Sequence, residues 1–303
     1  MDEIEDGDDE NEAIDEKTRR ISEICDEKRS NCALIPCSDV PKGSWTCPIG
    51  FCKTPYNVSF PLEERVDTIL SYFDLPESEI PDFMTLYLDE PDIQGHKYGP
   101  DDPRITEAVA KVDKMIGRVI KGLKKRKVFS DVHVILLGDH GMAYFPVLAM
   151  NPRWGKDVEN PNEKNMELVA KMNEALSSGK VENGEFLQVY LKEKLPKRLH
   201  YSESSRIPPI IGMVGEGLMV KQNRTNVQEC FGNHGYDNMF FSMRSIFIGH
   251  GPRFRRGKKV PSFENVQVYN VVVEILGLRP APNNGSSLFT QSILLPFGAT
   301  RET

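Results

Sequence analysis

Asp92 and His96 are the first pair of residues in this sequence whose types and spacing suit metal chemistry. They follow the apolar run Leu86–Leu88, and Pro91 blocks continuation of that run as a strand. A carboxylate oxygen and an imidazole nitrogen are both ligands that zinc accepts. Gly95 lets the backbone fold tightly, so we expect both side chains to turn onto one ion.

Two later stretches repeat this design. Asp139 and His140 open a glycine-containing turn directly after the apolar run Val132–Leu137, and His234 lies in the glycine-rich turn Gly232–Gly235. Ligands in open α/β sheets gather beyond the carboxyl ends of the strands. Because two of the three turns follow strand-like runs, the five side chains predict a metal site at one edge of a sheet.

The motifs that contain these residues resemble those of a known enzyme family. They are Glu90-Pro91-Asp92-x-x-Gly95-His96-x-Tyr98-Gly99-Pro100, Gly138-Asp139-His140-Gly141-Met142 and Asn233-His234-Gly235-Tyr236-Asp237-Asn238. Three further stretches agree, namely Pro61–Val66, Leu195–Tyr201 and Pro280–Gly285. The chain is similar to the nucleotide pyrophosphatase/phosphodiesterase family of the alkaline phosphatase superfamily. The resemblance runs from Pro36 to Leu295 and covers only the later part of the family's catalytic domain.

This resemblance implies a zinc-dependent hydrolase of nucleotide phosphodiester or pyrophosphate bonds. Two zinc ions about 4 Å apart hold the phosphate oxygens in that family, and a threonine hydroxyl attacks phosphorus. Carried over by motif, Asp92, His96 and His234 hold one ion, and Asp139 and His140 contribute to the other.

Tyr56 and Tyr87 match aromatic positions of the family that contact the nucleoside, since stacking on a base needs only a flat ring. The alternative for Tyr87 is packing within a strand, and the alternative for Tyr56 is an ordinary loop position.

The resemblance also implies what the chain lacks. Residues 1–35 contain no match to the family's threonine nucleophile in its Thr-x-Pro-Asn setting, nor to one zinc-ligand aspartate. Covalent catalysis needs an activated hydroxyl beside the metal, so we expect one complete zinc site and a chain that is inactive alone. One alternative is a non-enzymatic zinc- or nucleotide-binding pseudoenzyme or truncated isoform. Another is a choline-phosphodiesterase or phosphomonoesterase of the same superfamily, because metal ligands alone do not fix the substrate.

The apolar runs predict an α/β fold. Phe83–Leu88 and Val132–Leu137 are expected to be strands, and the helix between them begins at Asp102-Pro103, an N-cap followed by a first-turn proline. This order predicts a right-handed crossover and a parallel sheet. Further helices are expected over residues 61–73, 163–176 and 266–278, and further strands over residues 186–191, 210–214 and 244–249.

Together with the resemblance, this order gives an alkaline-phosphatase-like parallel sheet flanked by helices and lacking the family's N-terminal strand or strands. We expect residues 1–35 to be an acidic, disordered lead-in, residues 36–297 a partial phosphodiesterase catalytic domain, and residues 298–303 a tail. Loss of a central strand exposes apolar edges and unpaired backbone groups, so low solubility or marginal stability is expected.

The charge and composition of the chain limit the classes of partner that it is expected to bind. The formal charge of −7 is concentrated in residues 1–16, which hold ten acidic residues and no basic one, so the rest of the chain is nearly neutral. That balance gives no electrostatic case for a nucleic-acid polymer or a membrane surface. No signal peptide and no transmembrane segment are expected from the sequence. The oligomeric state stays open.

Cysteines and glycosylation acceptors favour an extracellular or cell-surface protein. Five of the six cysteines fall between Cys25 and Cys52, a spacing typical of a disulfide-containing loop region whose pairing stays open. Asn57, Asn223 and Asn284 each begin an Asn-x-Ser/Thr acceptor sequence.

Overall fold

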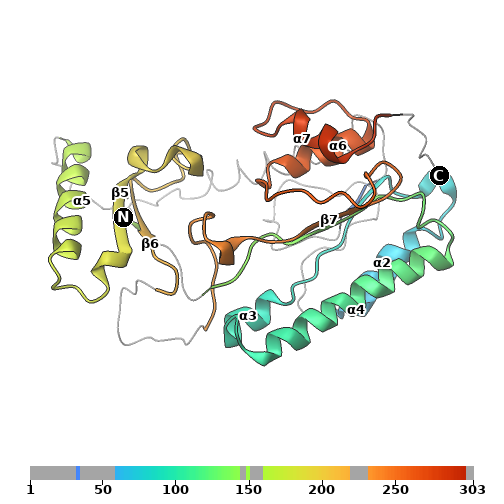
Figure 1. The fold of residues 1–303 in the computed structure, drawn as a ribbon, viewed down its shortest axis with the longest axis horizontal. Coiled ribbons are helices and arrows are strands. Elements are labelled where there is room, and N and C mark those ends of the chain that lie inside the picture. Colours follow the sequence, from blue (N-terminus) through green and yellow to red (C-terminus); the bar gives the residue numbers. More distant parts are fainter. Residues whose placement is uncertain (1–31, 35–58, 144–147, 151–159, 219–230, 298–303) are drawn as a thin grey trace, which may run out of the picture. The chain divides into compact units, whose positions relative to one another are not determined.

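The computed structural model describes residues 32–34, 59–143, 148–150, 160–218 and 231–297 (Figure 1). The chain divides into two compact units that are interleaved in sequence. Unit 1 comprises Met1–Asp89, Lys111–Leu136 and Phe247–Thr303, and unit 2 comprises Glu90–Ala110 and Leu137–Ile246.

Unit 1 contains two short pairs of strands. Strand β1 (Cys32–Leu34) lies parallel to β2 (Phe83–Thr85), with Cys32 opposite Phe83, and β3 (Val134–Leu137) pairs with β7 (Phe247–His250). Among the described residues β2 and β3 are therefore not paired with each other, although a shared sheet was predicted from their order. The parallel pair β1–β2 was not predicted either, because β1 lies inside the stretch 1–35 that was expected to be a disordered lead-in.

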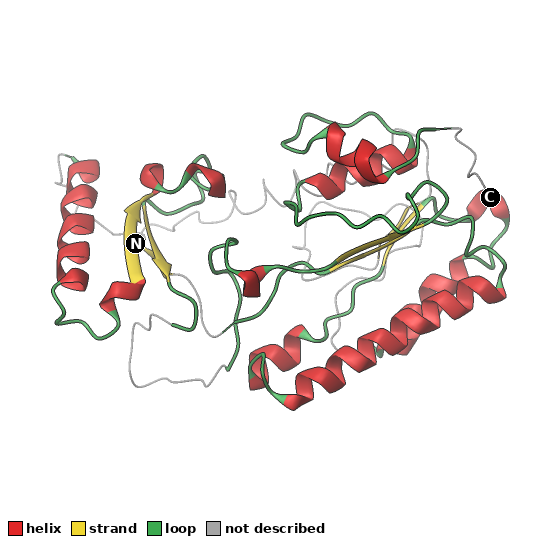
Figure 2. Ribbon diagram, in the orientation of Figure 1, coloured by secondary structure: helices red, strands yellow, loops and turns green. Residues whose placement is uncertain are grey.

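Helices cover both faces of strand β3 in unit 1 (Figure 2). Helix α2 (Leu62–Tyr72) packs against α4 (Pro103–Lys125) through Val66, Leu70 and Met115, and Val134 packs against that cluster. Ile135, the next residue of β3, packs instead against the cluster of α6 (Gln267–Leu276) and α7 (Ser287–Ile293). Alternating side chains of a strand point to opposite faces, so β3 joins two apolar cores.

Unit 2 contains an antiparallel sheet in the order β4 (Leu148–Met150), β6 (Ile210–Val214), β5 (Leu187–Leu191). Strands β5 and β6 pair with Leu187 opposite Val214 and Leu191 opposite Ile210. Helix α5 (Pro161–Ser177) packs on this sheet, and its N-cap Asn160 accepts a hydrogen bond from the backbone of Glu163. The strands over β5 and β6 and this helix were predicted, whereas β4 and the antiparallel pairing were not.

The remaining elements are short. Helix α3 (Asp92–Tyr98) lies in unit 2, and five 3₁₀ turns occur in the described residues, at Glu77–Glu79, Gly184–Phe186, Lys192–Lys194, Lys197–Leu199 and Phe241–Met243. Within the described ranges, none of the helices combines the length and the apolar character that a bilayer crossing requires.

A candidate metal centre

Helix α3 sets the geometry of Asp92 and His96. The sequence predicted a tight turn here, but the structure has a helix in which residues four apart share a face. The Nε2 atom of His96 lies 3.5 Å from Oδ2 of Asp92, and each side chain is about one-third exposed. The helix ends at Tyr98, and the next residue, Gly99, has a φ of 84°, a conformation that favours glycine.

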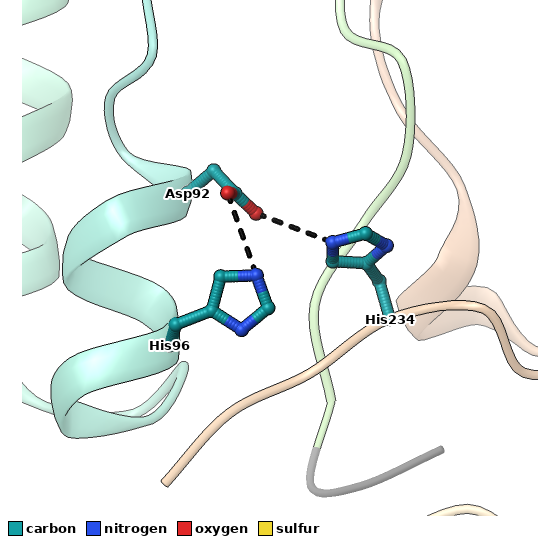
Figure 3. Close-up of side chains that lie close together, drawn as sticks. All are labelled: Asp92, His96 and His234. Carbon is teal, nitrogen blue, oxygen red and sulfur yellow. Dashed lines mark ion pairs between the residues drawn. The ribbon is translucent and has the colours of Figure 1, made fainter. Parts of the chain in front are cut away.

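His234 approaches the same carboxylate from a separate segment (Figure 3). Its Nε2 atom lies 3.7 Å from Oδ1 of Asp92, and its ring centroid is 5.1 Å from that of His96. One ligand atom from each of Asp92, His96 and His234 lies within 4.8 Å of the others. Three side chains from two distant parts of the sequence can therefore reach one ion.

A backbone carbonyl fixes the tautomer of His96. The Nδ1 atom of His96 lies 2.8 Å from the carbonyl oxygen of Gly232. A carbonyl oxygen can only accept, so Nδ1 carries the proton and donates it to this bond. In the neutral imidazole Nε2 then carries the lone pair and faces Asp92, which is the arrangement found in metal-binding histidines.

The segment around His234 is held on its N-terminal side by backbone contacts. Asn233 and Ala143 exchange two hydrogen bonds, of 2.7 Å and 2.5 Å, which link this segment to the turn that carries Asp139 and His140. The side chain of Asn233 also accepts a hydrogen bond of 2.8 Å from the backbone of His234. Gly232 allows the close approach to α3, because an added Cβ there would lie 2.3 Å from the carbonyl oxygen of Gly95.

Side chains hold the same segment beyond His234. The hydroxyl of Tyr236 donates to the carbonyl of Leu218 at 3.1 Å. Arg198 donates through both terminal nitrogens to the carboxylate of Asp237, and through one of them to Asn238 at 3.0 Å. This ion pair lowers the pKa of Asp237, with the hydrogen bond from Arg198 as its largest cause. Hydrogen bonds therefore hold the chain on both sides of His234.

His140 lies directly against His234. The two rings are stacked with centroids 3.4 Å apart and an interplanar angle of 15°. Gly141 makes the turn possible, since its N–H donates to Met243 and an added Cβ would lie 1.7 Å from the carbonyl oxygen of Ser242. Asp139 is beside His140, at 3.5 Å between Oδ2 and Nε2, but its side chain is 68% exposed. The structure thus brings all five predicted residues together, with Asp139 the most open to solvent.

The electrostatics of the centre suit a cation. Oδ1 of Asp92 is buried and has no hydrogen-bond partner among the described residues. A buried carboxylate oxygen without a partner is costly, and a bound cation would satisfy it. Burial, followed by the neighbouring His140, lowers the pKa of His234, which favours the neutral imidazole that binds metals. One carboxylate and two imidazoles match the donor types of zinc sites.

The other predicted residues belong to unit 1 or fall outside the described ranges. Tyr87 follows β2 in unit 1, is half-buried, and accepts a hydrogen bond at its carbonyl from Arg65 at 3.3 Å. Asn284 is exposed in the turn before α7. Tyr56, Asn57 and Asn223 fall outside the described residues, as does most of the cysteine-rich segment.

The sequence did not reveal two of the residues that hold the centre. Arg198 and Asn233 both lie inside motifs that carry the family resemblance, and membership of those motifs was the available signal. What the motifs do not show is that Arg198 contacts a residue 39 positions further along the chain.

Comparison with known proteins decides the family. The model of the family "Type I phosphodiesterase / nucleotide pyrophosphatase" matches residues 7–146 and 144–237. The chain belongs to this family. The match begins at residue 7, well before Pro36, where the sequence resemblance was first placed.

Curated relatives share more than a third of the residues in the matched region. Venom phosphodiesterase 2 of Crotalus adamanteus is 38% identical over 246 residues, which cover 76% of this chain and 30% of the relative. Ectonucleotide pyrophosphatase/phosphodiesterase family member 1 of Mus musculus is 38% identical over 256 residues, covering 76% and 27%. The chain therefore spans less than a third of the length of these relatives.

Solved structures agree with the fold. Murine ectonucleotide pyrophosphatase/phosphodiesterase 5 superposes with a TM-score of 0.75 at 30% identity, covering 91% of this chain and 74% of that one. An inactive variant of the murine protein in complex with AMP superposes with a TM-score of 0.74. The predicted alkaline-phosphatase-like α/β fold and the predicted superfamily are therefore confirmed.

Proposed function

We propose that this chain supplies the metal centre of a zinc-dependent nucleotide pyrophosphatase/phosphodiesterase. The observation that carries the proposal is the convergence of Asp92, His96 and His234, with ligand atoms within 4.8 Å of one another. The buried oxygen of Asp92 that lacks a hydrogen-bond partner supports it, because that oxygen needs a cation.

Contacts within the chain favour the metal-binding protonation state of both histidine ligands. His96 would bind through Nε2, since its Nδ1 proton is held by the carbonyl of Gly232. Burial lowers the pKa of His234, which favours its neutral form, and His234 would bind through the nitrogen that faces Asp92. When bound, zinc would polarise a phosphoryl oxygen of the substrate and stabilise the charge that develops on it.

Asp139 and His140 form half of a second ion site in this proposal. They lie beside the first centre through the stacking of His140 on His234, and the solvent exposure of Asp139 makes its carboxylate accessible to an ion. The 303-residue sequence contains no Thr-x-Pro-Asn motif. We therefore expect this polypeptide alone to bind zinc without turning over a phosphodiester.

Nucleotides are the proposed substrate class of the protein. The names of the relatives and the AMP complex of the murine structure support it. Tyr87 and Tyr56 are proposed to stack on the base, as their positions in the sequence predicted. An extracellular location, with glycosylation at the exposed Asn284, is proposed because the relatives are named venom enzymes and ectoenzymes.

Metal analysis and a turnover assay test this function together. The purified chain, dialysed against zinc and then against zinc-free buffer, should retain about one zinc ion, the number that one complete ligand set holds. His96→Ala should lose it, whereas His200→Ala, which changes a histidine outside the centre, should not. Equal zinc content in the His96→Ala chain would refute the ligand assignment. Steady release of nitrophenol from p-nitrophenyl-TMP would refute the expected inactivity of the 303-residue chain.

A further inference from the structure

A turn between β7 and α6 concentrates positive charge. The sequence from Arg253 to Val260 reads Arg-Phe-Arg-Arg-Gly-Lys-Lys-Val, and no acidic residue occurs between Asn238 and Phe263. Arg255, Arg256, Lys258 and Lys259 are all exposed, and Gly257 between them has a φ of 65°. We call residues 255–259 the basic turn.

The base of the basic turn is firmly anchored in unit 1. Phe254 is buried in the core cluster of α6 and α7 and forms an antiparallel bridge with Leu294. The backbone of Arg255 donates to Ile293 at 2.9 Å, and Leu295 donates to Arg253 at 2.7 Å. The turn is thus presented from a fixed platform, so little further ordering of its backbone is needed on binding.

Arg253 differs from the four cations of the basic turn. Its guanidinium donates to the carboxylate and the carbonyl of Glu274, so its charge is already paired within the fold. In the part of the chain that the structure describes, the other four side chains form neither a hydrogen bond nor an ion pair. Four cations in a five-residue turn repel one another, and an external anion would relieve that repulsion.

The composition of the basic turn narrows the class of anion. The ring within this stretch, Phe254, is 7% exposed and faces the core, and the ring of Phe297 packs against the guanidinium of Arg253, 4.0 Å from the ring centroid, so the basic turn itself offers no ring for stacking on nucleic-acid bases. The basic turn also carries no apolar side chain that could enter a bilayer. What the turn offers is two guanidinium groups that can bind oxyanions through two hydrogen bonds, and two ammonium groups.

We infer that the basic turn binds a sulfated polysaccharide of the extracellular surface, a polymer with dense anionic groups and no bases or hydrocarbon. The net charge of −7 does not oppose this, because at about 0.15 M salt charges more than about 8 Å apart are largely screened. Lysine- and arginine-rich segments of this length are typical of nucleic-acid- or heparin-binding patches, and the absence of a ring in residues 255–259 favours heparin.

Heparin chromatography of the full 303-residue chain tests the inference. The test variant replaces Arg255, Arg256, Lys258 and Lys259 by glutamine. A matched control replaces Lys114, Lys121, Lys124 and Lys125, which are exposed on α4, and so removes the same formal charge. We expect the unmodified chain and the control to stay bound above about 0.15 M NaCl, and the test variant to elute at or below it.

Several results would overturn the inference. They are failure of the unmodified chain to bind heparin, elution of the test variant together with the unmodified chain, and an equal loss of retention in the control. If the fourfold variant does not fold, Lys258→Gln with Lys259→Gln should still give an intermediate elution salt, while Arg255→Lys with Arg256→Lys should keep most of the retention.

Competing ligands identify the partner class. Soluble heparin should release the chain from the column, whereas desulfated heparin at the same concentration should not. If a single-stranded oligonucleotide or vesicles of phosphatidylserine bind the chain with the same salt resistance as heparin, and lose binding in the test variant, the partner is a nucleic acid or a membrane and the polysaccharide assignment is wrong.

Discussion

Arg198 donates a pair of hydrogen bonds to the carboxylate of Asp237, three residues beyond His234. Asp237 also accepts a hydrogen bond of 2.9 Å from the backbone of Met239, so the ion pair fixes the turn that follows the histidine. We expect Arg198→Ala to weaken zinc binding by about 10-fold at most, because Arg198 acts through Asp237, whereas groups that hydrogen-bond a ligand directly contribute about 10- to 100-fold. Isothermal titration with zinc measures it.

Arg118→Ala is the matched control for this variant. Arg118 makes the same two-bond contact with a carboxylate, that of Asp67, but it joins α2 to α4 and touches no residue of the 231–238 segment. Equal losses of zinc affinity in the two variants would mean that general loosening of the fold, and not the position of His234, governs binding.

Gly232 is expected to tolerate no side chain. In Gly232→Ala the new Cβ would meet the carbonyl oxygen of Gly95 at 2.3 Å, and neither backbone can move without displacing His96 or His234. We expect a loss of about 1–3 kcal/mol in unfolding free energy, the range for overpacked sites, together with weaker zinc binding. Gly117→Ala is the comparison, because a Cβ there meets nothing within 4 Å inside helix α4. That variant should be more stable by about 0.5–1 kcal/mol in urea denaturation.

The contribution of Asp237 to stability should depend on pH. Its pKa in the fold lies below the ordinary value of 3.8, so the unfolded chain binds a proton more readily. The contribution is complete well above pH 3.8 and disappears as the pH falls through the lowered pKa. In the metal-free chain, the difference in urea midpoint between the unmodified protein and Arg198→Ala should therefore shrink on acidification below pH 3.8. A gap that stays constant across that range would contradict this origin of the pKa shift.

Arg65 and Asp89 form a buried ion pair in unit 1. Their nitrogen and oxygen lie 3.0 Å apart, and the two residues are 3% and 6% exposed. Arg65→Met removes the guanidinium that faces this buried carboxylate, so we expect a loss of about 3–5 kcal/mol in unfolding free energy. The double variant Arg65→Met with Asp89→Leu should recover much of that loss, because no charge is then left unpaired. Additive losses in thermal or urea unfolding would argue against a direct pair.

The sequence predicts those parts of this structure that depend on neighbours along the chain. The apolar residues of α4 recur at helical spacing, and those of residues 132–137 form a continuous strand-like run. Both elements are found close to the expected bounds. Helix α3 was missed because Pro91 and Gly95 favour a turn locally, whereas contacts with Gly232 and Phe231 hold the segment as a helix. Strand β4 has only three residues, too few for a period, and it forms by pairing with β6 some sixty positions away.

The metal centre also combines features that the local sequence predicts with contacts between distant residues that it does not. Residue types and spacing identified the five side chains, but the link from Asn233 to Ala143 and the ion pair of Arg198 join residues that no local pattern connects. Such contacts depend on how the loops pass one another, and that is decided by the packing of the whole unit.

The proton of His96 is held by a main-chain carbonyl, that of Gly232. A side-chain partner can be deleted by one base change in the gene, but a peptide oxygen is present whatever residue is encoded there. The hydrogen-bonding state of this histidine can therefore be lost only when the path of the backbone itself shifts, as a side chain at position 232 would make it do.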